Sequence, residues 1–104
     1  MNKLKNTQNI KRIIMEPTAY TKCVIGQDWY ENHITIVFTP DEYYPDYTEL
    51  RDWIMENIDG KELNIEDVID IIYKLLQSEF RPKRLLIRDE IINSKTHFNV
   101  TVEK

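Results

Sequence analysis

The stretch that decides the fold is "NHITIVFT", residues 32–39. Apolar side chains alternate along it with mostly polar ones: Ile34, Ile36 and Phe38 on one side, His33, Thr35, Val37 and Thr39 on the other. A period of two residues is typical of a strand that is buried on one face only. We therefore predict a strand here, with one face on a core and the other toward solvent.

The preceding residues predict a hairpin partner for this strand. Residues 18–26 alternate as well, with Thr21, Cys23 and Ile25 on one side. The stretch "GQDWYE" lies between the two alternating runs, and its composition suits a loop of several residues. The first two elements are therefore predicted to be antiparallel neighbours.

The hydrophobic period then changes to that of two helices. Asp46 and Glu49 have the spacing of a capping box, and the helix they begin is expected to end at Asp59-Gly60. Asn64 is predicted to cap the second helix, and Pro82 forbids its continuation. Beyond it we predict a strand at 83–91, a loop at 92–95 and a strand at 96–103, with these side chains facing inward: Phe98, Val100 and Val102.

The predicted order is ββααββ, an α+β fold with a four-stranded antiparallel sheet and two helices on one face. Residues 18–104 are expected to form one domain. Residues 1–17 are expected to form a basic, solvated arm, for which contact with RNA phosphates is the alternative. The outer strands of such a sheet lack partners, so edge-to-edge pairing between subunits is expected.

Composition limits the classes of function. A net charge of −4 argues against a general nucleic-acid binder. A single cysteine excludes an internal disulfide, which favours a cytoplasmic location. No apolar run approaches the roughly 20 residues that span a bilayer, so no membrane partner is expected. No metal site is assigned, because Cys23, His33 and His97 lack the close spacing typical of zinc ligands.

Several short motifs, taken with the ββααββ order, resemble the tunnelling fold (T-fold). They are Cys23, Gly26-Gln27, Pro40-Asp41, "TELRDWI", "NIED" and "RPKRLLI". Their order is most similar to that of the 7-cyano-7-deazaguanine reductase family, known as QueF, and its QueF-like branch. The resemblance implies a homo-oligomer with sites for a purine-like small molecule at the subunit junctions.

The resemblance also implies roles for three residues. Cys23 would attack a nitrile carbon and form a thioimide, Asp28 would deliver the proton, and Glu66 would hold the purine edge. The structural alternatives are that Cys23 is a buried strand residue and that Glu66 stabilises the helix dipole.

The family's nicotinamide-binding motif is largely missing. At that point this chain reads "DYTELR", in which only Arg51 keeps the positive charge, so NADPH is implied by the family but not by these residues. A short archaeal branch lacks the same motif and modifies a deazaguanine already present in tRNA. The expected function is a deazapurine-modifying enzyme of queuosine or archaeosine-type tRNA modification, a nitrile reductase or amidinotransferase. The alternative is a non-catalytic T-fold protein that binds purines or serves in assembly.

Overall fold

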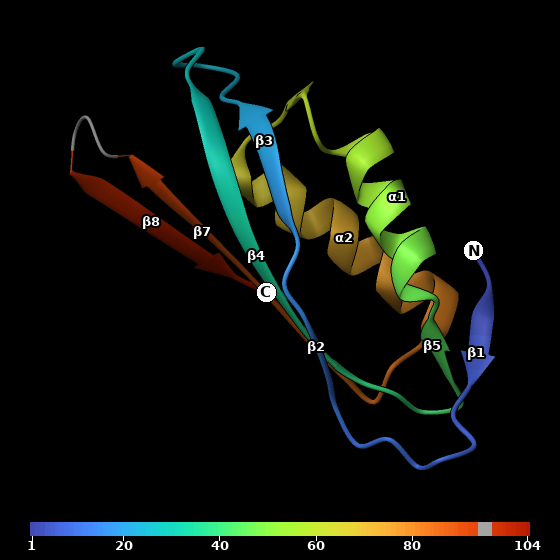
Figure 1. The fold of residues 1–104 in the computed structure, drawn as a ribbon. Helices are drawn as coiled ribbons and strands as arrows, with labels where there is room; N and C mark the ends of the chain where they lie inside the picture. The colour runs from blue at the N-terminus through green and yellow to red at the C-terminus, as the bar shows by residue number, and fades with distance from the viewer. Residues whose placement is uncertain (94–96) are drawn as a thin grey trace.

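The computed structural model describes residues 1–93 and 97–104, which fold into two helices and a mostly antiparallel sheet arrangement (Figure 1). In chain order the elements are β1 (Lys3–Lys5), β2 (Ile13–Met15), β3 (Thr18–Lys22), β4 (Trp29–Thr39), β5 (Tyr43–Pro45), α1 (Tyr47–Asn57), β6 (Lys61–Glu62), α2 (Ile65–Phe80), β7 (Arg84–Asn93) and β8 (Phe98–Glu103). The predicted α+β class is confirmed. Both helices lie on the same side of the main sheet.

The main sheet has the strand order β6-β3-β4-β7-β8, and β2 also pairs with β4. Within the described residues it has six strands rather than the predicted four. One extra strand is β6, a two-residue segment parallel to β3, and the other is β2. The four long strands, β3, β4, β7 and β8, are neighbours in the order of the chain, because each pairs antiparallel with the next.

β2 and β3 pair with the same edge of β4, as two parts of one interrupted strand. Ile13 lies opposite Phe38 and Thr18 lies opposite His33, so the register is the same on both sides of the break. At the break Pro17 has no N–H to donate, yet its carbonyl accepts from the Ile34 N–H at 3.0 Å. The first strand therefore starts well before residue 18.

The basic N-terminal segment is mostly exposed, and it carries two short strands that its composition did not predict. β1 pairs with β5 to form a second, two-stranded sheet, and β2 joins the main sheet. Three-residue strands carry a weak alternation signal, and their partners lie roughly 20 to 40 residues away in sequence. The pairing could not be read from residues 1–17 alone.

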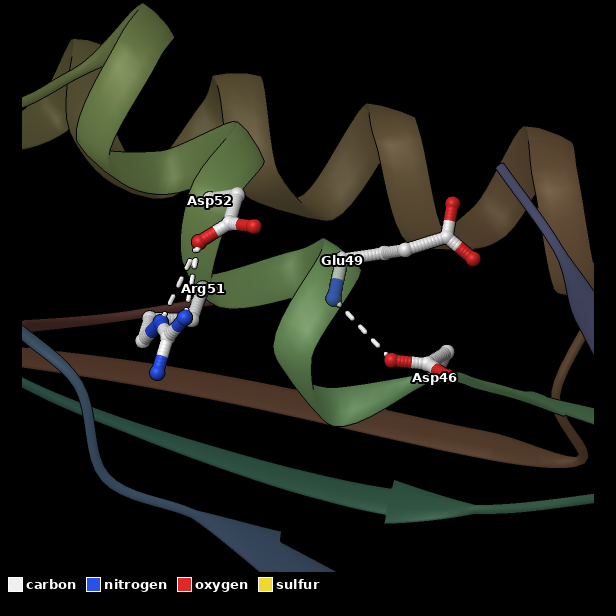
Figure 2. Close-up of polar contacts among 4 residues, drawn as sticks. All are labelled: Asp46, Glu49, Arg51 and Asp52. Carbon is white, nitrogen blue, oxygen red and sulfur yellow. Dashed lines mark hydrogen bonds and ion pairs between the residues drawn. The ribbon is translucent and has the colours of Figure 1, made fainter.

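The helix termini agree with the capping prediction. The Asp46 side chain accepts from the Glu49 N–H at 3.1 Å at the start of α1 (Figure 2). At the start of α2, the Asn64 N–H donates to the Asp67 carboxylate at 3.2 Å. α2 ends at Phe80, and its C-cap residue Arg81, which precedes Pro82, has a left-handed backbone with φ of 47°. These local bonds replace partners that the helix ends lack.

The core lies between the sheet and the two helices. It contains the apolar face of β4 together with the inward faces of both helices, and Phe38 packs edge-on against Phe80 with ring centroids 6.2 Å apart. The prediction for Phe98 is wrong, because its side chain is 65% exposed. Phe98 does fall on the predicted face but sits at the tip of the β7–β8 pair, beyond the helices that cover the sheet (Figure 1).

The loop predicted at 92–95 lies partly outside the described residues, and β7 extends through Asn93. Among the helices described, none is long and apolar enough to cross a membrane.

Candidate functional site

The loop between β3 and β4 is a tight turn that starts at Cys23 and ends at Asp28. The Cys23 N–H donates to the Asp28 carbonyl at 2.8 Å, and the Gln27 N–H donates to the Cys23 carbonyl at 3.0 Å. Gln27 adopts a φ of 59° to close the turn. The predicted first strand therefore ends at Lys22 rather than at residue 26, and Ile25, predicted to share a strand face with Cys23, is 88% exposed in the turn.

Asn64 attaches this turn to the start of α2. Its Oδ1 accepts from the Val24 N–H at 3.1 Å and from the Cys23 thiol at 3.6 Å. The Cys23 sulfur also accepts from the Gly26 N–H at 3.4 Å. The thiol is therefore held beside the first turn of α2. Sequence reasoning found Asn64 as a cap but missed this second role, because the contacts join residues about 40 positions apart.

A pocket opens where the turn, the sheet and the start of α2 meet. Its volume is about 300 Å³, at the small end of the range for small-molecule sites. Cys23 and Glu66 both line it. The remaining walls are mostly apolar, and they comprise Ile25, Tyr30, Leu63, Ile65, Ile91 and Val100, with Thr21, Asn32 and Asn64 as polar members. Two of the three predicted site residues thus share one cavity.

Asp28, the third predicted residue, lies on the same turn but does not line the pocket. It is exposed. A Cβ atom at position 26 would lie 3.8 Å from the Asp28 Oδ2 and 3.9 Å from the Cys23 sulfur. The Asp28 carboxyl group and the thiol therefore both lie close to Gly26. A rotation of the Asp28 side chain is needed to bring its carboxyl group over the pocket.

Asn32 is a polar group on the pocket wall that sequence reasoning missed. Its Nδ2 donates to the Thr21 Oγ1 at 2.8 Å and to the Ala19 carbonyl at 3.1 Å. Its Oδ1 is buried and has no hydrogen-bond partner among the described residues. Such an unpartnered buried acceptor costs stability. The signal was present, because Asn32 occupies the buried face of the strand that decides the fold.

Asp89 lies on the same face of the sheet, one strand away. It is fully buried, opposite Ile34 on β4 and Val102 on β8. Neither carboxylate oxygen has a partner among the described residues. Burial raises the pKa of Asp89 to about 7. It does not line the pocket, so its effect is expected on stability rather than on ligand contact.

The start of α1, where the resemblance noted in the sequence implied a nicotinamide-binding motif, does not fit a nucleotide phosphate. Three carboxylates gather there, those of Asp46, Glu49 and Asp52 (Figure 2). Arg51 donates to the Asp52 carboxylate at 3.0 Å, and Glu49 accepts from the Asn2 N–H at 3.3 Å. These carboxylates would repel a phosphate, and the Arg51 guanidinium is already paired with Asp52.

The two histidines lie apart from this pocket. His33 is 3.7 Å from Glu31 on the exposed face of the sheet, and His97 is exposed. Within residues 1–93 and 97–104, no three histidine, cysteine, aspartate or glutamate side chains are close enough to bind a metal ion together.

Comparison with known proteins places the fold. No protein-family model matches the sequence, and no curated protein matches it. Among solved structures, the chain is similar to the archaeosine synthase QueF-Like in its apo form. The TM-score is 0.76 at 10% sequence identity, over 91% of this chain and 94% of that chain. At this identity the likeness establishes a QueF-like fold.

Proposed function

We propose that the pocket binds a deazapurine base carrying a nitrile, and that Cys23 forms a thioimide with it as a step of tRNA modification. The observation that carries this proposal is the shared pocket of Cys23 and Glu66. The two residues are 43 positions apart and come from different elements, a turn and a helix. Their meeting in a mostly apolar cavity supports a site for a flat base with one polar edge.

Glu66 has the geometry to read that edge. A carboxylate accepts two parallel N–H bonds, which suits the ring N–H and amino group of a guanine-type base. Its position in the first turn of α2 also favours a negative charge through the helix dipole. Glu66 can bind the edge of the base and stabilise the helix dipole at the same time. Its place in the pocket lining supports the first of these roles.

The chemical step uses the turn that holds Cys23. The thiolate sulfur adds to the nitrile carbon, and one π bond of the C≡N group breaks to place an electron pair on nitrogen. That nitrogen takes a proton from the Asp28 carboxyl group, which leaves a neutral thioimide and an Asp28 carboxylate. The Gly26 N–H donates to the sulfur and can stabilise the thiolate, whereas the Asn64 Oδ1 accepts from the thiol and is released when the thiol loses its proton.

The subsequent step is proposed to be non-reductive. The acidic start of α1 does not suit a nucleotide phosphate. A nitrogen nucleophile can instead attack the thioimide carbon and expel the thiolate, which gives an amidine without a hydride donor. This outcome is that of an amidinotransferase rather than a nitrile reductase.

Assembly into a T-fold homo-oligomer by edge-to-edge strand pairing is part of the proposal. Large apolar side chains are exposed near the pocket and the adjacent hairpin tips: Tyr20, Val24, Ile25, Trp29, Ile92 and Phe98. Apolar groups gathered in this way mark an interaction surface. A second subunit placed there would cover the mouth of the pocket.

The test is an intact-mass measurement after incubation with 7-cyano-7-deazaguanine. Wild type is expected to gain the mass of one base per chain, and Cys23→Ala is expected to gain none. Glu66→Gln should form the adduct at least about tenfold more slowly at low ligand concentration, because it loses a charged hydrogen bond. Glu56→Gln, the same change on the exposed side of α1, is the matched control and should react like wild type.

Absence of an adduct on wild type, or an adduct that persists in Cys23→Ala, would contradict the thioimide. A second candidate then follows: a purine-binding or assembly protein without chemistry. The position of Asp28 outside the pocket lining favours it. Ligand binding by wild type that is weakened in Glu66→Gln, with no mass gain, would identify this candidate.

A further inference from the structure

Two Lys-Arg pairs, Lys11-Arg12 and Lys83-Arg84, meet at one end of the sheet although about 70 residues separate them. Arg84 lies opposite Thr39 on β4. On the other side of β4, Ile13 lies opposite Phe38, so the preceding Arg12 falls next to Thr39 as well. Thr39 therefore has an arginine on each flank. We call these four cations the basic patch.

The basic patch borders two adjoining hollows. One is about 500 Å³ and is lined by Arg12, Lys83 and Arg84, with no acidic residue in its lining. The other is also about 500 Å³ and is lined by Lys11 and Lys83, with Asp41 as its one acid. Thr39 and Lys83 line both hollows, so the two lie side by side.

The cations of the basic patch are free to meet a ligand. All four are exposed. Among the described residues, every ion pair within 4.0 Å involves other side chains. A local surplus of unpaired positive charge in a concave surface attracts an anionic polymer.

We propose that the basic patch binds the phosphate backbone of RNA. Arginine and lysine together with a hydroxyl are the groups that contact phosphate oxygens most often. The hollow also carries Tyr73, Pro82 and Leu86, which can pack against riboses or bases. A recessed surface fits a polynucleotide strand better than it fits a flat bilayer. The identity of that RNA as tRNA rests on the function proposed above.

The basic patch and the Cys23 pocket lie at opposite ends of β4. Asn32 on the pocket wall and Thr39 between the arginines are seven residues apart on one strand, which corresponds to roughly 23 Å. A free base in the pocket is too small to touch the basic patch, whereas a polynucleotide can span that distance. Changes in the basic patch should therefore affect RNA binding and leave the reaction with the free base unchanged.

The experiment measures binding of a fluorescent, unmodified tRNA transcript to the full chain by anisotropy, between about 50 and 200 mM salt. For Lys83→Gln with Arg84→Gln, the plot of log K against log salt should become shallower by about 1.4 to 1.8, as two lost phosphate contacts predict. Arg51→Gln with Lys61→Gln has the same residue types and charge change away from the basic patch, and should bind like wild type. Lys11→Gln with Arg12→Gln provides a second variant should the first fail to fold, and the same change in slope is expected.

Equal losses in the control pair, an unchanged slope in both patch variants, or no binding by wild type would overturn the proposal. Wild type that binds phosphatidylglycerol vesicles but no tRNA would also overturn it, in favour of a membrane surface. The adduct measurement keeps the two proposals separate. If wild type forms the adduct but both patch variants bind RNA like wild type, only the proposal for the basic patch is contradicted. If the patch variants show the expected shallower salt dependence of RNA binding but wild type forms no adduct, only the thioimide is contradicted.

Discussion

Asp89→Asn is expected to abolish a pH dependence of stability worth about 4 kcal/mol between about pH 4 and pH 8. The wild-type carboxyl group is fully buried among apolar side chains, and neither oxygen has a partner among the described residues. Burial raises its pKa from 3.8 to about 7, because the charged form loses its hydration.

The direction follows from the proton that the folded state retains. Below the unfolded pKa both states are protonated and the group imposes no penalty. Between about pH 4 and 7 the unfolded chain releases its proton while the folded chain keeps it, so the free energy of unfolding falls as pH rises. Above about 7 the folded carboxylate is ionised too, and the full loss remains.

Urea unfolding at unit steps of pH measures this dependence. The free energy of unfolding of wild type should fall toward pH 8. That of Asp89→Asn should stay constant over the same range, except for the contributions of other titrating groups. Asp70→Asn is the control, because the exposed Asp70 pairs with Lys104 and Lys74, which lower its pKa. That variant should keep the wild-type loss above pH 5. A wild-type protein whose stability is constant from pH 5 to 8 would show that Asp89 is hydrated.

For the monomeric chain at low protein concentration, Phe38→Ala is expected to cost about 3 to 5 kcal/mol of unfolding free energy, and Phe98→Ala no more than about 0.5. The chemical change is identical, and both residues lie on the helix-facing side of the sheet. Phe38 is fully buried against Phe80, whereas Phe98 is beyond the helices. The difference arises from the cavity that the missing ring leaves in the core.

Chemical unfolding of both variants under one set of conditions checks this. Similar losses for the two would mean that Phe98 is buried, as its place in the alternation alone suggested. Losses that are small for both would mean that the β4–α2 core is not formed as described. An oligomer that covers Phe98 would show itself as a loss in Phe98→Ala that depends on protein concentration.

Local patterns predicted the central strands and both helices. The alternation of Ile34, Ile36 and Phe38, and the caps at Asp46 and Asn64, depend on residues only a few positions apart. Interactions of this kind are encoded in a short window, so one sequence suffices to find them.

Features that depend on distant partners were missed or misplaced. The pairing of residues 13–15 with β4 and of residues 3–5 with β5 needs the folded chain. The same is true of Asn64, which holds the Cys23 turn, and of the basic patch, whose two halves are far apart in sequence. Alternation assigns a face to a residue but does not say whether another element covers it, which is why Phe98 was misjudged.

The polar residues on buried strand faces were the overlooked signal within the sequence itself. Asn32 continues the apolar face of β4, and Asp89 continues that of β7. A polar residue at such a position costs stability unless it gains a partner, so it points to a site or to a pH-sensitive group. Cys23 and Glu66 were found by resemblance, and their shared pocket became visible only in the fold.

Alkylation of Cys23 in the presence of a ligand tests the central claim, that this pocket binds a purine-like base, most directly. Cys23 is the single cysteine, so iodoacetamide labelling followed by mass spectrometry reports on this site alone. Guanine, which has no nitrile and cannot form the thioimide, is expected to slow labelling of wild type in a saturable manner, and to protect Glu66→Gln at least about tenfold less well. Labelling rates that do not change at any guanine or 7-cyano-7-deazaguanine concentration, or equal protection of wild type and Glu66→Gln, would contradict the account.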